Sequence, residues 1–390
     1  MNPLLQKLQQ ISQKKERRII GLMSGTSMDG LDIALCRISG TGYDTNFDLE
    51  EFATVAYKDD IRHQLIALVR TPTLDAEQLC VWNTHLAHIH ASQVKKIVAE
   101  WGVRPQEVDL IASHGQTLHH APKQKHRMKG MPNATLQIGD GDHLAKQTGV
   151  ITISDFRQRD TARGFEGAPL AAYGDYLLFG KPDITRVLLN IGGIANLTVL
   201  PEGGRKFPPF ATDTGPGNTL IDAMTEAHYG GLTYDIDGGL AARGNVHDKL
   251  LSCLKGHPFF KQKAPKTTGF EVFHPDWVRE CIEKSGFQLQ AEDLLATLTR
   301  LTTDTIISEI QNVLHENGNA EIFVSGGGAN NITMMKQLDD GLSPHRLQTT
   351  ESLGVGTDAK EAVLFAALAN ELICGEDTRL HFGKISLPDT

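Results

Sequence analysis

Two short apolar segments near the beginning of the chain enclose a run of glycine, serine and threonine. Residues 18–20 lead into this run and residues 31–36 lead out of it, with hydrophobic and polar positions partly alternating. Alternation of this kind predicts two β-strands joined by a tight turn. A second pair of apolar segments, at residues 186–190 and 197–200, encloses the glycine pair within residues 191–196 in the same way. We therefore expect two strand–turn–strand units, each opening one half of the chain.

Longer apolar stripes predict helices that accompany these strands. Leucine and isoleucine recur at helical spacing through residues 290–317. The other expected helices and strands follow from shorter stretches of the same two patterns. These are helices at residues 1–16, 76–102 and 358–372, and strands near residues 108–112 and 149–153.

Composition adds the size and the surroundings of the protein. The chain has 390 residues, of which 40% are hydrophobic and 22% charged, so it can form two sizeable cores. We expect a helical extension at residues 1–16, an N-terminal lobe at 17–185 and a C-terminal lobe at 186–390. A net charge of −9 without a stripe of lysine and arginine argues against a nucleic-acid partner. No apolar run suits a membrane helix or a signal peptide, so we expect a cytoplasmic protein with no membrane partner.

The spacing of the cysteines also fits a cytoplasmic protein. There are five, and no two of them form a Cys-x-x-Cys pair. Such scattered cysteines argue against a disulfide framework or a zinc site, and we expect most of them to be buried thiols.

The residue types of the first turn, within residues 21–32, suit the binding of phosphate. Gly25 and Gly30 can adopt positive φ angles and let the backbone approach a ligand closely. Groups that can donate hydrogen bonds to phosphate oxygens come from Ser24, Thr26 and Ser27. Asp29 can hold a magnesium ion through water. The same composition also fits an ordinary Gly/Ser hairpin turn.

Three later segments have the composition of other parts of a nucleotide site. The second turn is one of them, and Asp213, which precedes a Gly-Pro-Gly loop at residues 215–217, marks another. Residues 322–325 form an apolar strand that runs into three glycines, against which the sugar and base of a nucleotide can lie. Two phosphate turns, an acidic loop and a glycine-rich loop follow in the order of the acetate and sugar kinase, Hsc70 and actin superfamily. We therefore expect an α/β protein with a two-lobed actin-like ATPase (ribonuclease H-like) fold and an active site in the interlobe cleft. The resemblance to this superfamily also implies that the helix at residues 358–372 of the C-terminal lobe returns toward the cleft.

Short motifs make the resemblance more specific. They are Gly-Leu-Met-Ser-Gly-Thr-Ser-Met-Asp-Gly at 21–30, Ser-His-Gly-Gln-Thr at 113–117, Asp-Phe-Arg at 155–157, Gly-Ala-Pro-Leu at 167–170, Leu-Asn-Ile-Gly-Gly at 189–193, Asp-Thr-Gly-Pro-Gly-Asn at 213–218 and Ser-Gly-Gly-Gly-Ala at 325–329. With these motifs the chain resembles the anhydro-N-acetylmuramic acid kinase family over nearly its whole length. The resemblance implies an enzyme of peptidoglycan recycling that uses water to open 1,6-anhydro-N-acetylmuramic acid and phosphorylates O6. Its products would be N-acetylmuramic acid 6-phosphate and ADP.

The same resemblance implies ATP and Mg²⁺ as cofactors, an amino sugar as the second small-molecule partner, and a homodimer. It assigns the nucleotide to the two turns and to the later glycine loops, with Asp29 also binding the metal. The residues concerned are Ser24, Gly25, Thr26, Ser27, Met28, Asp29, Gly30, Leu31, Gly192, Gly193, Asn196, Gly215, Gly326, Gly327 and Gly328.

A kinase that opens an ether bridge with water needs a carboxylate to accept a proton. Asp213 matches the family's catalytic aspartate and is expected to be this base, although it could instead cap the segment that begins near Asn218. Glu361 matches a family acid and is expected to orient the water, with an exposed helical glutamate as the alternative. Asp222 is expected to be structural or to support the site from the next helix.

Three residues are candidates for contact with the sugar, namely Arg159, His114 and Gly167. Residues 155–160 are expected to form a strand, on which Arg157 and Arg159 share one face. By its family position Arg159 is expected to contact the substrate or the catalytic water, with a structural ion pair as the alternative. His114 is expected to lie in a turn after a strand, hydrogen-bonded near the sugar.

The motifs on the acceptor side depart from the family pattern. Phe165 and Glu166 replace a glycine and a neutral amide, Phe270 replaces an arginine, and Gly356-Thr357 replaces two prolines. These departures leave open a kinase of the same fold that acts on another amino or anhydro sugar. A non-catalytic sugar sensor is a further alternative, which the presence of Asp213 disfavours.

Overall fold

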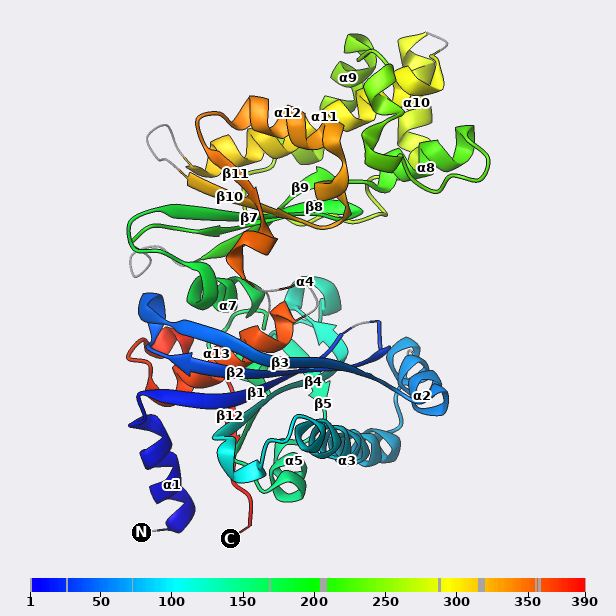
Figure 1. Cartoon of the computed structure of the whole chain (residues 1–390). Coiled ribbons are helices and arrows are strands. Elements are labelled where there is room, and N and C mark those ends of the chain that lie inside the picture. Colours follow the sequence, from blue (N-terminus) through cyan, green and yellow to red (C-terminus); the bar gives the residue numbers. More distant parts are fainter. Residues whose placement is uncertain are drawn as a thin grey trace. The chain divides into compact units, whose positions relative to one another are not determined.

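Two β-sheets, one in each structural unit, organise the chain (Figure 1). The computed structural model describes residues 2–25, 27–71, 73–167, 170–203, 209–286, 289–314, 320–354, 356 and 359–389. Unit 1 comprises Met1–Leu178 and Val355–Thr390, and unit 2 comprises Phe179–Gly354. Unit 2 is therefore one continuous segment that interrupts unit 1.

The sheet of unit 1 has the order β12-β6-β4-β1-β2-β3, with β5 paired to β4. The strands β1, β2 and β3 are antiparallel to one another, whereas β4 runs parallel to β1 and β6 runs parallel to β4. Their bounds are β1 Glu16–Ser24, β2 Gly30–Ser39, β3 Asn46–Ala56, β4 Leu110–Ala121, β5 Ala134–Ile138, β6 Thr152–Ser154 and β12 Lys384–Ser386.

The sheet of unit 2 has the order β11-β10-β7-β8-β9. Its strands β7, β8 and β9 form an antiparallel meander, and β10 and β11 continue parallel to β7. The bounds are β7 Thr185–Ile191, β8 Ile194–Leu200, β9 Phe210–Pro216, β10 Ala320–Ser325 and β11 Arg346–Thr349. Both units thus place three antiparallel strands beside two parallel ones in the same order, which is the ribonuclease H-like arrangement. The expectation of an α/β fold with two such lobes is confirmed.

Unit 1 has eight described α-helices. They are α1 Pro3–Ser12, α2 Asp59–Arg70, α3 Ala76–Glu100, α4 Lys123–His126, α5 Gly141–Thr148, α6 Phe156–Ala162, α7 Leu170–Phe179 and α13 Lys360–Cys374. Of these, α2, α3, α5, α6 and α13 contact strands of its sheet. α13 packs directly on β1, because a Cβ atom at Gly21 would lie only 1.8 Å from the carbonyl oxygen of Ala362. An aliphatic core, with Ile20, Leu86 and Ile111 among its buried members, fills the space beneath α3.

The C-terminal segment differs from its expected place in the C-terminal lobe. α13 contacts β1, β2 and β4, and β12 pairs with β6 of the same sheet. The side chains from Ala362 to Glu371 are buried. These contacts place the segment in unit 1. Burial of the apolar side chains of α13 against the sheet of unit 1 lowers the free energy of the folded protein, so the helix packs there although unit 2 precedes it in sequence.

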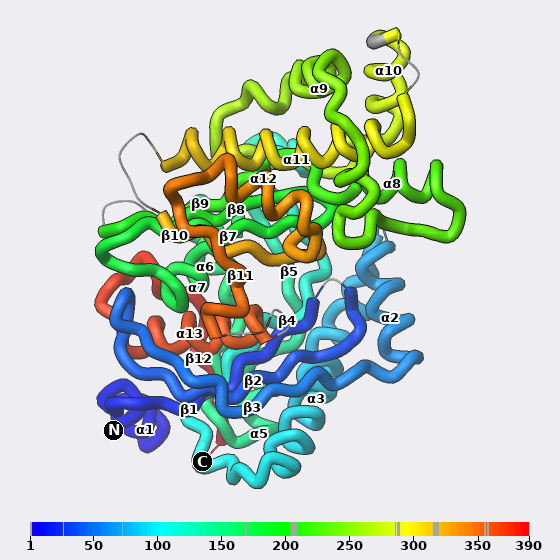
Figure 2. The backbone as a smooth tube through the Cα atoms, turned by 45° about the horizontal axis from the view of Figure 1, so that its top comes forward, coloured from blue at the N-terminus to red at the C-terminus, as the bar shows by residue number. Residues whose placement is uncertain are grey.

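The helices of unit 2 are α8 Thr219–His228, α9 Asp248–Lys255, α10 Pro275–Ser285, α11 Ala291–Leu314 and α12 Ile332–Leu342. Figures 1 and 2 show α11 and α12 side by side along the same sheet. A disulfide joins Cys253 of α9 to Cys281 of α10. The expectation that most cysteines are buried thiols is wrong, because the packing of α9 on α10 brings together two thiols that are 28 residues apart in sequence, and because Cys80 is exposed and Cys374 is only half-buried.

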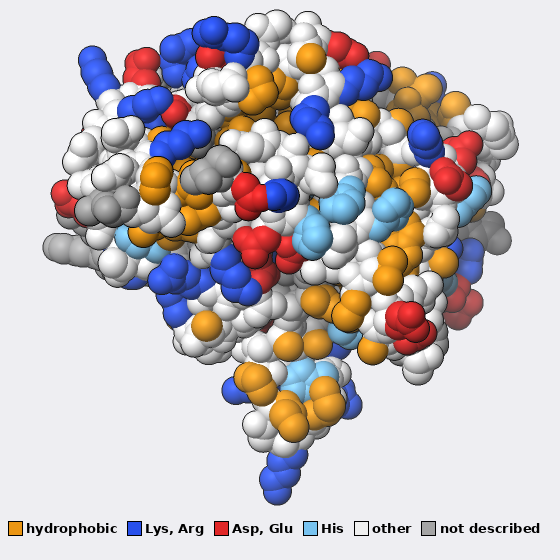
Figure 3. Space-filling model, turned by 90° about the horizontal axis from the view of Figure 1, so that it is seen from below, with side chains coloured by type: hydrophobic (Ala, Val, Ile, Leu, Met, Phe, Trp, Pro, Cys, Tyr) orange, Lys and Arg blue, Asp and Glu red, His pale blue; other side chains and the backbone are white. Residues whose placement is uncertain are grey.

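The surface mixes charges of both signs on the face that Figure 3 shows, where histidines also gather beside hydrophobic side chains. Among the described residues, no helix combines the length and the apolar character that a membrane span requires.

Candidate active site

The first turn joins β1 to β2. Met28 N–H donates to Gly25 O (3.2 Å), Met28 has a φ angle of 51°, and Tyr57 N–H donates to Asp29 O (3.0 Å). A Cβ atom at Gly30 would lie 2.6 Å from Val55 O, so only glycine lets β3 approach here. The turn is thus closed by backbone hydrogen bonds on both sides.

The side chains of this turn divide into exposed and buried groups. Ser27 and Asp29 are exposed and linked by a hydrogen bond from Ser27 Oγ to Asp29 Oδ1 (2.9 Å). Met28 and Leu31 are buried in the core of unit 1, so only their backbone can face a ligand. Thr26 lies outside the described residues. The Asp29 carboxylate is therefore the acid of this turn that can reach a metal ion through water.

The Ser24 hydroxyl has a different place from the one expected. Ser24 is only 2% exposed, and its hydroxyl donates to Gln116 Oε1 (2.6 Å) in β4. Gln116 Nε2 in turn donates to Gly25 O (3.2 Å). The hydroxyl of Ser24 consequently holds the turn in place, and its expected use as a phosphate donor is not supported.

His114 lies in β4 and not in a turn, so that expectation is wrong. Leu22 pairs with Ser113 but Ser24 pairs with Gln116, which leaves His114 and Gly115 in a β-bulge where Gly115 has a φ angle of 73°. Glycine allows this conformation, and the bulge redirects the strand.

The environment of His114 fixes its protonation. Arg157 Nε donates to His114 Nε2 (2.9 Å), and His114 Nδ1 donates to Gly115 O (2.9 Å). Burial, followed by the charge of Arg157, lowers the pKa of His114 to about 3. His114 is therefore neutral near pH 7 and serves as an acceptor for Arg157.

Residues 156–162 form the helix α6, so the expectation of a strand here is wrong. Residues two apart on a helix point to nearly opposite sides. Arg157 accordingly faces His114 while Arg159 is exposed.

A pair of side chains from α6 holds Gly167. Arg157 Nη1 donates to Gly167 O (2.8 Å), and Gly167 N–H donates to Asp160 Oδ2 (2.8 Å). Gly167 has a φ angle of 80°, which a side chain would disfavour. Arg157 and Asp160 were not selected from the sequence; the spacing of three residues would have indicated them only if the helix had been recognised.

Glu361 lies in the first turn of α13 and is exposed there, as the alternative of an exposed helical glutamate described, and its carboxylate interacts electrostatically with Arg157. Partial desolvation raises the pKa of its carboxylate; the charges of Lys360 and Arg157 oppose this shift, and those of Asp32 and Asp175 add to it. Glu361 and Arg157 thus form the charged part of a polar cluster in unit 1.

In unit 2, Asp213 lies near the end of β9. Asp213 N–H donates to Lys266 O (2.9 Å), and Thr268 N–H donates to Asp213 Oδ2 (2.7 Å). Burial raises the pKa of Asp213, and the Thr268 N–H partly offsets this shift. Because the carboxylate binds Thr268, the alternative of a cap for the segment at Asn218 is not supported.

The glycine loops of unit 2 pack against one another. Gly217 N–H donates to Gly193 O and Asn218 N–H donates to Gly192 O, both at 2.8 Å. A Cβ atom at Gly326, whose φ angle is 82°, would lie 2.7 Å from Ile191 O. These contacts bring the turn between β7 and β8 to the end of β10, as the sequence pattern implied. Asn196 pairs with Asp213 across β8 and β9, and Gly215 follows in β9.

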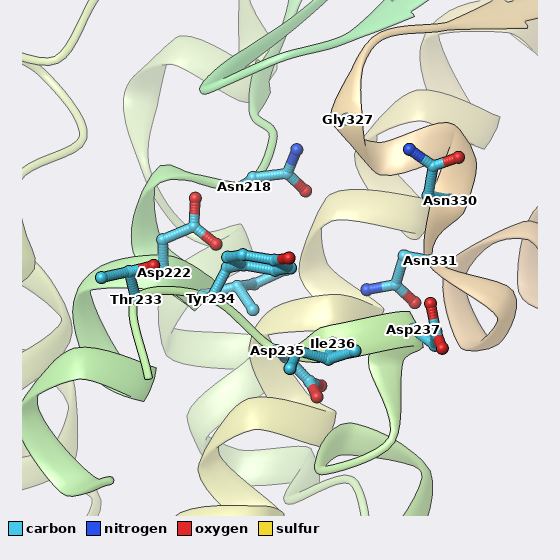
Figure 4. Close-up of a pocket in the computed structure, with 11 residues that line it drawn as sticks. Asn218, Asp222, Thr233, Tyr234, Asp235, Ile236, Asp237, Gly327, Asn330 and Asn331 are labelled. Atoms are coloured by element: carbon cyan, nitrogen blue, oxygen red, sulfur yellow. The ribbon is translucent and has the colours of Figure 1, made fainter. Parts of the chain in front are cut away.

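A cavity of about 600 Å³ opens beside these loops (Figure 4). It is lined by Asn218, Ile221, Asp222, Thr233, Tyr234, Asp235, Ile236, Asp237, Gly327, Asn330 and Asn331. Figure 4 shows Asn218, Asp222 and Asn331 around the ring of Tyr234. Burial, followed by the charge of Asp235, raises the pKa of Asp222 to about 6. Asp222 lies one helical turn from Asn218, which is the signal that would have placed it at the cavity.

Residues 235–239 form a turn that the Asp235 carboxylate stabilises. Asp235 accepts hydrogen bonds from Leu240 N–H (2.8 Å) and Ala241 N–H (2.9 Å). Both oxygen atoms of the Asp235 carboxylate therefore already accept hydrogen bonds from the backbone. Among the described residues, no group of three or more metal-binding side chains is present.

Two ribonuclease H-like units with glycine turns and a carboxylate at a strand end define the class of two-lobed kinases and ATPases of the actin-like fold. Within this class, a sequence profile described as Anhydro-N-acetylmuramic acid kinase matches residues 17–381. The chain belongs to this family.

Relatives that carry this name cover nearly the whole chain. The anhydro-N-acetylmuramic acid kinase of Pseudoalteromonas atlantica is 44% identical, with all of both chains covered. The one from Caldanaerobacter subterraneus is 39% identical over 95% of this chain and 94% of its own. A solved structure, the activator of 2-hydroxyisocaproyl-CoA dehydratase from Clostridium difficile with bound ADPNP, is similar over 95% of this chain and 99% of its own, at 12% identity and a TM-score of 0.38. The family assignment rests on the profile and on the two sequence relatives.

Proposed function

We propose that this protein is an ATP-dependent kinase that opens 1,6-anhydro-N-acetylmuramic acid with water and phosphorylates O6. The observation that carries the proposal is the environment of Asp213. One carboxylate oxygen, Oδ2, is held by Thr268 N–H, and no hydrogen bond to Oδ1 is found within the described ranges. The carboxylate is thus oriented and has an oxygen available to accept a proton, as a general base requires.

The reaction balances through this one base. Asp213 accepts a proton from water, the water oxygen bonds to C1 of the sugar, and the bond from C1 to O6 breaks with its electron pair on O6. O6 then attacks the γ-phosphorus of ATP, and the bond to the β-phosphate oxygen breaks to release ADP. The raised pKa of Asp213 makes it a stronger base when ionised than an exposed aspartate.

Each unit, taken by itself, holds elements that suit a part of the nucleotide. The backbone of the β1–β2 turn, with Ser27, suits the phosphates, and Asp29 would bind Mg²⁺ through water. When bound, the magnesium ion neutralises charge on the transferred phosphoryl group. In unit 2, Gly192 and Gly193 suit phosphate, and the cavity beside Gly327 has the polar lining and size for the ribose and base.

The sugar is assigned to the polar cluster of unit 1. Arg157 offers a positive charge held in place by His114 and Gly167, which suits the carboxylate of the lactyl group. Glu361, whose charge interacts with Arg157, would orient the attacking water. Arg159, which is exposed, stays a second candidate for contact with the sugar.

The same proposal places the protein in the cytoplasm, in peptidoglycan recycling, as a homodimer. It is supported by the family membership of the chain. Sedimentation of the purified protein would test the dimer.

Release of ADP from ATP·Mg²⁺ tests the proposed reaction directly. The reaction is run with 1,6-anhydro-N-acetylmuramic acid, with N-acetylmuramic acid, with N-acetylglucosamine and without sugar. We expect strong release with the anhydro sugar alone. Turnover of another sugar in its place would contradict the proposal and indicate that Phe165, Glu166 and Phe270 have changed the acceptor.

A further inference from the structure

Four buried polar side chains form a continuous chain of hydrogen bonds behind the first turn. His90 Nε2 lies 2.8 Å from Tyr57 Oη, and Tyr57 Oη lies 2.8 Å from Ser24 Oγ. Ser24 Oγ lies 2.6 Å from Gln116 Oε1. These residues come from α3, from the segment after β3, and from β1 and β4, so the chain connects four separate parts of unit 1.

The direction of each hydrogen bond follows from the number of protons available. The amide oxygen of Gln116 can only accept, so the Ser24 hydroxyl proton is directed to it. Ser24 Oγ then accepts the proton of the Tyr57 hydroxyl, and Tyr57 Oη accepts from His90 Nε2–H. His90 is consequently the tautomer with its proton on Nε2.

The four hydrogen-bonded side chains are shielded from water, and none of them changes its charge near neutral pH. His90, Tyr57, Ser24 and Gln116 are each no more than 5% exposed. Burial lowers the pKa of His90 to about 3 and raises the pKa of Tyr57 above its ordinary value. Both side chains are therefore neutral near pH 7, and the donor order stays the same.

Gln116, the last residue in this series of hydrogen bonds, contacts the backbone of the β1–β2 turn. With its oxygen engaged by Ser24, Gln116 donates its Nε2–H to Gly25 O (3.2 Å). Ser24 ends β1, and Gly25 begins the turn. A change at His90 or Tyr57 is thus expected to reach Ser24 and Gly25, where β1 passes into the turn.

We propose that Tyr57 and His90 are positioning residues that hold the β1–β2 turn in its phosphate-binding geometry through Ser24 and Gln116. This inference rests on the proposed use of ATP. It assigns a function to two residues outside every motif noted in the sequence. It also explains why the Ser24 hydroxyl faces the protein interior.

The variant Tyr57→Phe tests the inference, because it removes one hydroxyl and keeps the ring. Loss of one net hydrogen bond, about 1 kcal/mol, corresponds to roughly a five-fold weaker interaction. We expect the KM for ATP to rise about three- to ten-fold, with little change in the KM for the sugar. Binding of a non-hydrolysable ATP analogue, followed by calorimetry, should weaken by the same factor.

Tyr176→Phe is the matched control. Tyr176 is a buried tyrosine of unit 1 whose hydroxyl is hydrogen-bonded to Tyr43. Neither residue belongs to the series of hydrogen bonds from His90 to Gln116. Equal ATP KM values for the two variants would overturn the inference. A wild-type protein that turns over no ATP with any sugar would instead overturn the proposed function.

A measurement on the wild-type protein tests the donor order directly. Long-range ¹H–¹⁵N correlation spectra distinguish the two histidine tautomers, and the signals that disappear in His90→Gln are assigned to His90. We expect a proton on Nε2 and a bare Nδ1 between pH 6 and 8. A proton on Nδ1, or titration of His90 in this interval, would overturn the proposed donor order.

Discussion

At the scale of single residues, the site depends on carboxylates that are not solvated like ordinary surface acids. Desolvation raises the pKa values of Asp213 and Asp222, which are half-buried, and also that of Glu361, although the Glu361 side chain is exposed. Asp213 is positioned near the end of β9, Asp222 in the first turn of α8 and Glu361 in the first turn of α13. Asp213, at a strand end before a Gly-Pro-Gly loop, could be selected from the sequence, whereas Asp222 gained its importance only when the cavity was visible.

Asp213→Asn should lose turnover and keep its stability. Removal of a general base lowers kcat by about 10²-fold or more, while Asn can still accept the hydrogen bond from Thr268 N–H. Since folding raises the pKa of Asp213, its ionised form opposes folding at neutral pH. The melting temperature of the variant should therefore equal or exceed that of the wild type. Near-normal kcat would remove Asp213 from the proposed reaction.

Asp222→Asn should show a stability effect that depends on pH. The folded-state pKa of Asp222 is about 6, above its ordinary value of 3.8, so the folded protein holds this proton more tightly than the unfolded chain. The contribution of this group to stability is fully present below about pH 4 and is lost as the pH rises through 6. Urea unfolding should show the variant to be more stable than the wild type at pH 8, with a smaller gain at pH 4.5. Equal gains at both pH values would count against this environment for Asp222.

At the scale of elements, the strands and long helices follow from hydrophobic periodicity, and the errors fall where periodicity is weakest. Residues 155–160 are too few and too polar to distinguish a strand from a helix, and α6 has seven residues. The β-bulge at His114 depends on the register of β1 against β4, which no local pattern contains. The disulfide between Cys253 and Cys281 likewise depends on how two helices pack.

The helix α6 predicts unequal effects for its two arginines. Arg157 holds Gly167 and His114 through two nitrogen atoms, whereas Arg159 is exposed. Lysine keeps the charge but cannot reproduce this two-nitrogen geometry. We expect Arg157→Lys to raise the KM for the sugar about ten-fold or more, because a hydrogen bond to a charged group contributes about 1.5–3 kcal/mol, and Arg159→Lys to raise it less. The reverse order in steady-state kinetics would restore Arg159 as the main contact.

A buried ion pair connects the segment that holds Asp213 to α11. Lys266 Nζ lies 2.6 Å from Glu309 Oε2, with side chains only 4% and 6% exposed. Lys266→Met leaves Glu309 unpaired and should lower the free energy of unfolding by about 3–5 kcal/mol. Replacing both residues, as in Lys266→Met with Glu309→Leu, should restore most of this loss in a urea titration. An unaltered midpoint for Lys266→Met would show that the pair contributes little.

At the scale of the whole molecule, the two sheets repeat one strand order, and this duplication could be inferred from two similar turns. The division of the chain could not, because α13 and β12 return to unit 1 through long-range packing. A hydrophobic stripe shows that a helix needs a partner surface but not which surface it will cover.

The division predicts which parts of the chain can fold alone. Residues 179–354 form one continuous unit with its own core, so this fragment should unfold cooperatively. Residues 1–178 lack α13, which covers β1, β2 and β4, and should bind a hydrophobic dye and lack a cooperative transition. A cooperative transition in the fragment of residues 1–178 would contradict the importance assigned to α13.

The insertion of unit 2 within unit 1 also sets an order of events during synthesis. A ribosome that has completed residue 354 has delivered every strand of unit 2, while the sheet of unit 1 still awaits its C-terminal helix. The lobe that starts first therefore finishes last, and its apolar face stays open throughout translation of the other lobe. Nascent chains of this protein should accordingly depend on chaperones until the final residues emerge.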